Sequence, residues 1–129
     1  MLITSTKVYM KIVVTSLGST LDSPMDPRFG RAAKFVLFDD ESQSFEVIEN
    51  TQYLNAAQGA GLQAAEIVSR AGADCVLTGH CGPKALKALT AAGIRVYSGV
   101  DATVKEAIKR FQDGRLVEAK SADFPSHSF

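Results

Sequence analysis

"DCVLTGHCGPKALKALTAAGIRVYS", Asp74–Ser98, contains the pattern that decides the fold. Its first apolar run predicts a short buried strand over Asp74–Thr78, and its last predicts another over Ile94–Ser98. Between them, Pro83–Ala92 is predicted to be a helix, with proline near its first position and Gly93 after its end. A strand, a helix and a strand in this order join parallel strands by a right-handed crossover, so the stretch predicts an α/β fold.

The same patterns predict further elements on both sides of this unit. They are strands over Lys11–Ser16, Lys34–Asp39 and Ser44–Glu49, helices over Gly59–Ala71 and Thr103–Asp113, and a short edge strand over Leu116–Ala119. Without that last short strand the order is β-β-β-α-β-α-β-α. This order predicts a mixed five-stranded sheet with helices on its faces.

Strand polarity predicts where a ligand would bind. If the first three strands form a meander, the third runs parallel to the first, and the crossovers keep the later strands parallel as well. One edge of the sheet then collects four connections: Leu17–Ala33, Asn50–Gln58, Gly79–Gly82 and Gly99–Ala102. Open α/β sheets bind ligands outside the carboxyl ends of their strands, so we expect the functional site at this edge.

Composition limits the class of protein. The chain has 129 residues, 14 basic and 14 acidic, with 46% hydrophobic residues. A single domain over residues 10–119 is expected, with residues 1–9 and 120–129 as disordered ends. The neutral balance argues against binding to nucleic acid or to a membrane surface, and the sequence has no apolar run long enough for a membrane span and no secretion signal.

The two cysteines, Cys75 and Cys81, lie too far apart along a strand and turn for a disulfide. Unpaired thiols are typical of a reducing compartment, so we expect a cytoplasmic protein.

A thiol and an imidazole lie side by side in "TGHCGPKA", Thr78–Ala85. Gly79 and Gly82 allow a sharp turn and a close approach of the backbone to a ligand. Cys81 stands near the start of a helix, where the pKa of a thiol is lowered, and together with His80 it would suit soft metal chemistry. The alternative is a turn whose cysteine packs inward and whose histidine faces water. Two adjacent ligands also do not complete a metal site, so the pair would have to anchor a group that brings its own ligands.

Cations gather in the long connection after the first strand. "DPRFGRAAKF", Asp26–Phe35, places Arg28, Arg31 and Lys34 beside Phe29 and Gly30. Guanidinium groups suit multiply charged anions. The structural alternative is that one arginine pairs with a carboxylate, with Asp22, Asp26 and Asp39 as the available partners.

Other chemistries fit the sequence less well. It contains no GxxxxGK[ST] phosphate-binding loop, and no GxGxxG follows the first strand. "GAG" at Gly59–Gly61 is explained equally well by helix packing. A catalytic pair of Cys81 and His80 would need a third, orienting residue, and the sequence offers none at a recognisable spacing.

With these residues identified, the chain resembles the dinitrogenase iron–molybdenum cofactor-binding family, which includes NifX-like and NifB C-terminal-like domains. The resemblance rests on "DPRFGRAAKF", "GAGLQAAEIVSRAGADCVLTG", "GPKALKALTAAGIRVYSG" and "DGRL", which lie in the family's order within Met10–Leu116. It implies a three-layer α/β/α fold of the ribonuclease H-like type without ribonuclease activity. It also implies non-catalytic binding or delivery of anionic metal–sulfur clusters, as in the similar orange-protein carriers.

The leading hypothesis is therefore a carrier or scaffold, not an enzyme, for a preformed anionic iron–sulfur or molybdenum-containing cluster. His80 and Cys81 would be metal ligands, and Arg28 and Arg31 would neutralise charge, with Lys34 a weaker candidate. Gly79 would belong to the same binding site. Backbone N–H groups at Gly82 and Lys84 would help to bind the anion, and Phe29 would cover the cluster. Donor or recipient proteins are the implied partners. Two alternatives stay open: an enzyme acting on an anionic small molecule in the same cleft, and a regulatory interaction domain.

Overall fold

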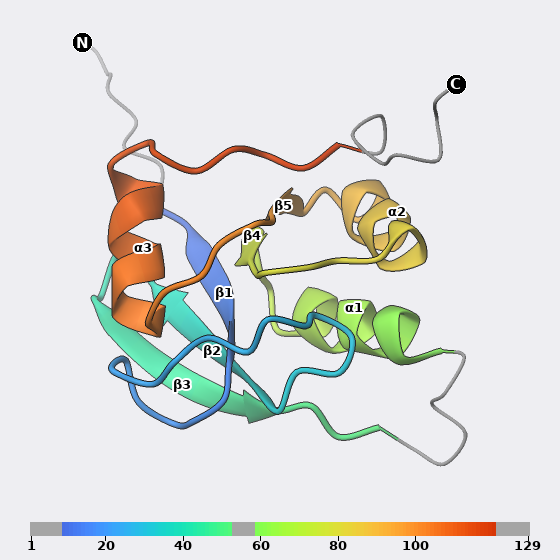
Figure 1. Cartoon of the computed structure of the whole chain (residues 1–129), viewed down its shortest axis with the longest axis horizontal. Helices are drawn as coiled ribbons and strands as arrows, with labels where there is room; N and C mark the ends of the chain where they lie inside the picture. Colours follow the sequence, from blue (N-terminus) through green and yellow to red (C-terminus); the bar gives the residue numbers. More distant parts are fainter. Residues whose placement is uncertain (1–8, 53–58, 121–129) are drawn as a thin grey trace, which may run out of the picture.

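The computed structural model describes residues 9–52 and 59–120 of the chain, and these form one mixed sheet with three helices (Figure 1). In chain order the elements are β1 (Lys11–Ser16), β2 (Lys34–Asp39), β3 (Ser44–Glu49), α1 (Ala60–Arg70), β4 (Cys75–Leu77), α2 (Pro83–Ala91), β5 (Arg95–Tyr97) and α3 (Val104–Gln112). This is the expected order of strands and helices.

The sheet has the strand order β3-β2-β1-β4-β5, with β1 at its centre. β1 pairs antiparallel with β2 and parallel with β4, so that Val13 stands opposite Leu37 on one side and Val76 on the other. β2 and β3 form the antiparallel hairpin, and β5 continues parallel to β4. The predicted strand polarity is therefore confirmed, and the carboxyl ends of β1, β4 and β5 lie at one edge.

Each face of the sheet builds its own core, because neighbouring residues of a strand point to opposite faces. Val13 and Val76 belong to the apolar cluster beneath α1 and α2. Val14 and Leu77, next to them in sequence, belong to the cluster beneath α3. Figure 1 shows α1 and α2 on one side of the sheet and α3 on the other. The expected three-layer α/β/α architecture is confirmed.

The three helices begin differently. α3 starts with a capping box, in which the hydroxyl of Thr103 accepts the backbone N–H of Glu106 and the Glu106 side chain accepts the N–H of Thr103. α1 and α2 start at Gly59 and Gly82, which provide no side-chain hydrogen bond to the helix. The first N–H groups of a helix have no partner within it, and at α1 and α2 the N-cap residue supplies none of them with a side-chain acceptor.

The segment after α3 does not form the strand that its sequence predicts. The expected edge strand over Leu116–Ala119 is wrong: the segment meets β5 through one antiparallel bridge, Glu118 with Tyr97, and one hydrogen bond from Ala119 to Val96. One bridge and one hydrogen bond do not form a ladder, so β5 remains the edge strand of the sheet on this side. The expected disorder of residues 1–9 and 120–129 lies outside the described residues, apart from Tyr9 and Lys120.

In the described ranges, none of the helices has the length and apolar character that crossing a membrane requires.

Candidate functional site

Two connections that are far apart in sequence are joined at the carboxyl edge of the sheet. The N–H of Phe29 donates to the carbonyl of His80 at 3.0 Å, and the N–H of His80 donates to the carbonyl of Pro27 at 2.8 Å. A Cβ built on Gly79 would lie only 2.7 Å from that same Pro27 oxygen, so glycine is required at this contact. The arginine-bearing segment and the thiol–imidazole segment therefore meet, as the strand polarity predicts.

Asp26 holds the arginine-bearing segment in shape. Its buried carboxylate accepts the backbone N–H groups of Arg28 and Ala33, both at 3.0 Å, and the Arg28 guanidinium at 3.1 and 3.2 Å. Burial alone would raise the pKa of Asp26, but the hydrogen bonds from Arg28 and Ala33 outweigh it and lower that pKa below its usual value. The alternative in which one arginine pairs with a carboxylate thus holds for Arg28, with Asp26 as the partner.

The lowered pKa of Asp26 predicts how stability depends on pH. The stabilisation by this carboxylate is fully present above its unfolded-state pKa of about 3.9 and is lost as pH falls through the lower folded-state value. Asp26→Asn should cost about 2 kcal/mol at pH 7, and the difference from the parent should shrink below about pH 4. Denaturant unfolding at pH 7 and pH 3 measures both, with Asp22→Asn in the same loop as the exposed control. A difference that stays constant with pH would contradict the assignment.

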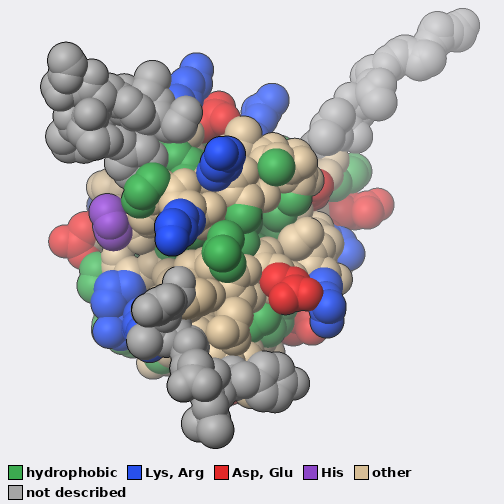
Figure 2. All heavy atoms as spheres, turned by 90° about the vertical axis from the view of Figure 1, so that its right-hand side faces the viewer, with side chains coloured by type: hydrophobic (Ala, Val, Ile, Leu, Met, Phe, Trp, Pro, Cys, Tyr) green, Lys and Arg blue, Asp and Glu red, His purple; other side chains and the backbone are tan. Residues whose placement is uncertain are grey.

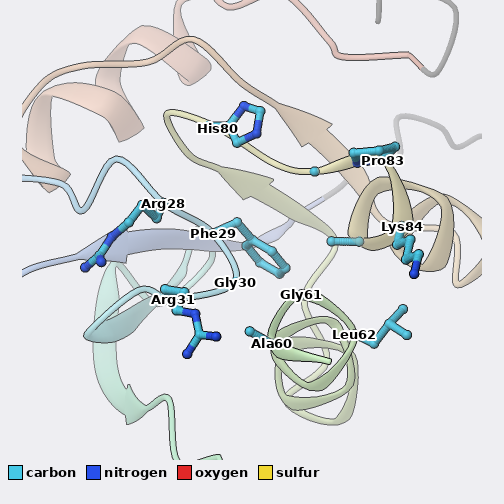
Figure 3. Close-up of a pocket in the computed structure, with 12 residues that line it drawn as sticks. Arg28, Phe29, Gly30, Arg31, Ala60, Gly61, Leu62, His80, Pro83 and Lys84 are labelled. Atoms are coloured by element: carbon cyan, nitrogen blue, oxygen red, sulfur yellow. The ribbon is translucent and has the colours of Figure 1, made fainter. Parts of the chain in front are cut away.

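A cavity of about 450 Å³ opens where the arginine-bearing segment meets the first turns of α1 and α2 (Figure 3). Its size lies within the range of small-molecule and cofactor sites. Three segments line it: Arg28, Phe29, Gly30 and Arg31; Ala60, Gly61 and Leu62; and His80, Gly82, Pro83, Lys84 and Ala85. Of the predicted site residues, Arg28, Phe29, Arg31, His80, Gly82 and Lys84 line this cavity, whereas Gly79 and Cys81 do not.

Glycines allow the three walls to approach closely. A Cβ on Gly30 would lie 2.9 Å from the backbone nitrogen of Gly61, and a Cβ on Gly61 would lie 3.1 Å from the Cβ of Ala85. The side chain of Gln52 also links two of these walls, because its amide donates to the carbonyls of Gly30 and Ala60 at 2.9 and 3.1 Å. The loop, α1 and α2 are therefore packed into one continuous rim.

The cavity has positive electrostatic character. Its described lining includes Arg28, Arg31, Lys84 and His80 and no acidic side chain. Neither α1 nor α2 carries an acidic residue in its first turn, so the positive ends of both helix dipoles face the cavity without compensation. Figure 2 shows Lys and Arg side chains and one His around hydrophobic side chains on the face where these helices begin. An anion is the ligand class that this arrangement suits.

The expectation of a thiolate at Cys81 is wrong. The side chain is 3% exposed and packs in the core beneath α1 and α2, and this burial raises its pKa to about 12. The sequence-based expectation rested on the nearby helix start, but desolvation disfavours the charged thiolate and dominates here. His80, by contrast, is exposed. The structure thus corresponds to the alternative in which the cysteine packs inward and the histidine faces water.

No cluster of three or more His, Cys, Asp or Glu side chains that could hold a metal ion occurs among the described residues. Metal ligation by His80 and Cys81 stays a prediction, and for Cys81 it would require the thiol to leave the core.

The buried thiols predict slow chemical labelling. Cys75 and Cys81 are both free and buried, and burial raises both pKa values to about 12. Alkylation by iodoacetamide at pH 8–9 should therefore be about a thousandfold slower in the native protein than in denaturant, because an exposed thiol titrates near pH 8.5 and these two thiols titrate more than three pH units higher. Peptide mass spectrometry after timed labelling identifies each cysteine. Rapid native labelling of Cys81 would show that its thiol reaches the cavity.

Two further expectations are corrected by the packing. Phe29 is 1% exposed and forms the floor of the cavity, against Phe35 at 5.8 Å between ring centroids, so it cannot close over a ligand as expected. Lys34 pairs with Glu49 across the β2–β3 hairpin at 2.8 Å and does not line the cavity. The first turn of α1, which does line it, was indicated in the sequence only by the two glycines of "GAG".

Fold and cavity together define a small α/β/α domain with a cationic cleft at the carboxyl ends of its parallel strands. The chain belongs to the dinitrogenase iron–molybdenum cofactor family, whose sequence model matches residues 10–114.

Two proteins of known structure and one further relative are similar to most of this chain. The apo form of the orange protein from Desulfovibrio gigas is 43% identical, with a TM-score of 0.82 over 85% of this chain and 92% of that one. A Thermotoga protein named as a candidate NifB protein is 36% identical, with a TM-score of 0.74 over 84% and 92%. An uncharacterized protein of Methanocaldococcus jannaschii is 30% identical over 83% of this chain and 93% of its own length. Membership of this family indicates a role in binding or carrying a cofactor or cluster.

Proposed function

We propose that this protein binds and carries a preformed anionic metal–sulfur cluster, of the iron–sulfur or molybdenum-containing type, and does not catalyse a reaction on it. The observation that carries the proposal is the convergence of two uncapped helix starts, Arg31 and Lys84 on one cavity. Two positive helix ends and two cationic side chains stabilise an anion of more than one charge. The family and the likeness to the orange protein support a cluster as that anion.

The apolar part of the lining distinguishes among anions. Phe29, Leu62 and Pro83 line the same cavity as the cations. A compact oxyanion is strongly hydrated and loses much free energy when it enters such a site, whereas a cluster spreads its charge over several sulfur atoms. A mixed apolar and cationic lining therefore favours a sulfur-rich anion over phosphate or sulfate.

Anaerobic titration with tetrathiomolybdate, and separately with a synthetic thiolate-ligated [4Fe–4S] cluster, tests the proposal by absorbance. Saturable binding that weakens as salt increases is the expected result, because the attraction is electrostatic. Molybdate and phosphate at the same concentrations should bind much more weakly.

If neither sulfur-rich anion binds and an organic phosphate instead raises Tm, the protein is better described as an enzyme for an anionic substrate. Recovery of a protein partner without any bound anion would favour an interaction domain.

His80 is the ligand that the described conformation offers to a metal, since this residue is exposed and lines the cavity. Cys81 is proposed as a second ligand only in a conformation in which its thiol has left the core. His80→Ala should then change the absorbance spectrum of the bound cluster, and Cys81→Ala should change it further. A double variant with the parent's spectrum and affinity would exclude ligation by either residue and leave electrostatic binding alone. Cluster donor and recipient proteins in the cytoplasm are the partners that this carrier role implies.

A further inference from the structure

Gly82 is the N-cap residue of α2 and has the backbone conformation of such a residue, but it has no side chain that could accept a hydrogen bond from the helix. Its dihedral angles, φ −67° and ψ 164°, nearly equal those of Thr103 at the start of α3, φ −76° and ψ 163°. At α3 the Thr103 hydroxyl accepts the N–H of Glu106 at 3.1 Å. The equivalent N–H at α2 belongs to Ala85, three residues after Gly82, and Gly82 offers it no side-chain acceptor.

Nothing in the packing requires a glycine at position 82. A Cβ built on Gly30, Gly61 or Gly79 would come within 3.1 Å of a neighbouring atom, whereas a Cβ built on Gly82 meets no atom within 4 Å. The negative φ of Gly82 is also accessible to any residue. Gly82 lines the cavity, so the space that its missing side chain leaves open adjoins the ligand site.

We infer that Gly82 is a specificity-determining residue: its lack of a side chain reserves the start of α2, and the space beside it, for the bound anion. The inference rests on the proposed function and deepens it, because it assigns the anion the role that the Thr103 hydroxyl has at α3. A side-chain acceptor at position 82 would satisfy the N–H of Ala85 and fill part of the cavity. The fold would be as stable as before or more so, but the anion would lose both a hydrogen-bond donor and room.

Three variants separate these effects, with tetrathiomolybdate as the probe. Gly82→Ser adds a neutral cap, Gly82→Asp adds a cap and a negative charge, and Thr103→Gly removes the natural cap of α3 on the opposite face of the sheet. Serine and aspartate are at least as favourable as glycine at a helix N-cap, so both Gly82 variants should keep or raise the parent's Tm. Their Kd for tetrathiomolybdate should rise about tenfold or more, with the larger loss for aspartate. Thr103→Gly should lower Tm and leave Kd unchanged.

The outcomes distinguish this inference from the function on which it rests. If the parent binds no tetrathiomolybdate and no synthetic [4Fe–4S] cluster, the proposed function fails, and the inference with it. If the parent binds and a folded Gly82→Ser variant binds equally well, the function stands and the inference is overturned. A loss confined to Gly82→Asp also overturns it, since charge repulsion alone would then suffice. Gly82→Ala, which adds size without a cap, provides the size test if either capping variant fails to fold.

Discussion

Lys84→Glu is expected to raise the Kd for tetrathiomolybdate about a hundredfold, equivalent to about 2.8 kcal/mol. The substitution replaces a cation in the cavity lining with an anion, so an attraction becomes a repulsion. Position 84 lies in the first turn of α2, where an acidic side chain is favourable, and Tm should therefore not fall. Anaerobic titration followed by absorbance gives Kd, and a thermal melt confirms the fold.

Lys87→Glu is the matched control for this prediction. Lys87 lies on the same helix and is exposed, but it does not line the cavity. Both substitutions change the net charge of the protein by the same amount, so a long-range effect of charge would appear in both. A loss of affinity in Lys87→Glu equal to that in Lys84→Glu would mean that the anion responds to the whole surface and not to this cavity.

The edge of the sheet at which the cavity opens could be predicted from the sequence, because it follows from strand polarity. Strands as short and apolar as Cys75–Leu77 were identified from their composition, and the crossover rule then fixed their direction. Once β1 and β4 are parallel, the connections after them must emerge at the same edge. The contact between Phe29 and His80 is a consequence of that topology.

The direction of individual side chains could not be predicted in the same way. Alternation along a strand gives the direction of Val76 and Leu77, but it ends with the strand, and Cys81 lies four residues beyond. In an irregular turn the packing decides, and here it places the thiol in the core. Similarly, three carboxylates were candidate partners for an arginine, and the choice of Asp26 depends on a loop fold that no local pattern encodes.

The sequence contains little indication that the first turn of α1 lines the cavity. Gly59 and Gly61 are consistent with an ordinary helix start, and the sequence does not reveal which surface they approach. In the structure, Gly61 is pressed between Gly30 and Ala85, so the first turn of α1 becomes one wall of the cavity. Only the packing of three segments from different parts of the chain gives that glycine its role.

Gly79→Ala is expected to lower stability by about 2–3 kcal/mol and to reduce Tm by roughly 10 °C. The added methyl group would lie 2.7 Å from the carbonyl oxygen of Pro27, which is backbone and cannot rotate away. The clash should separate the two segments and so weaken anion binding as well. Gly82→Ala, whose methyl group meets no atom within 4 Å, should cost no more than about 1 kcal/mol at its helix cap. Equal Tm values for the two variants would mean that the close contact between Gly79 and Pro27 does not hold the site together.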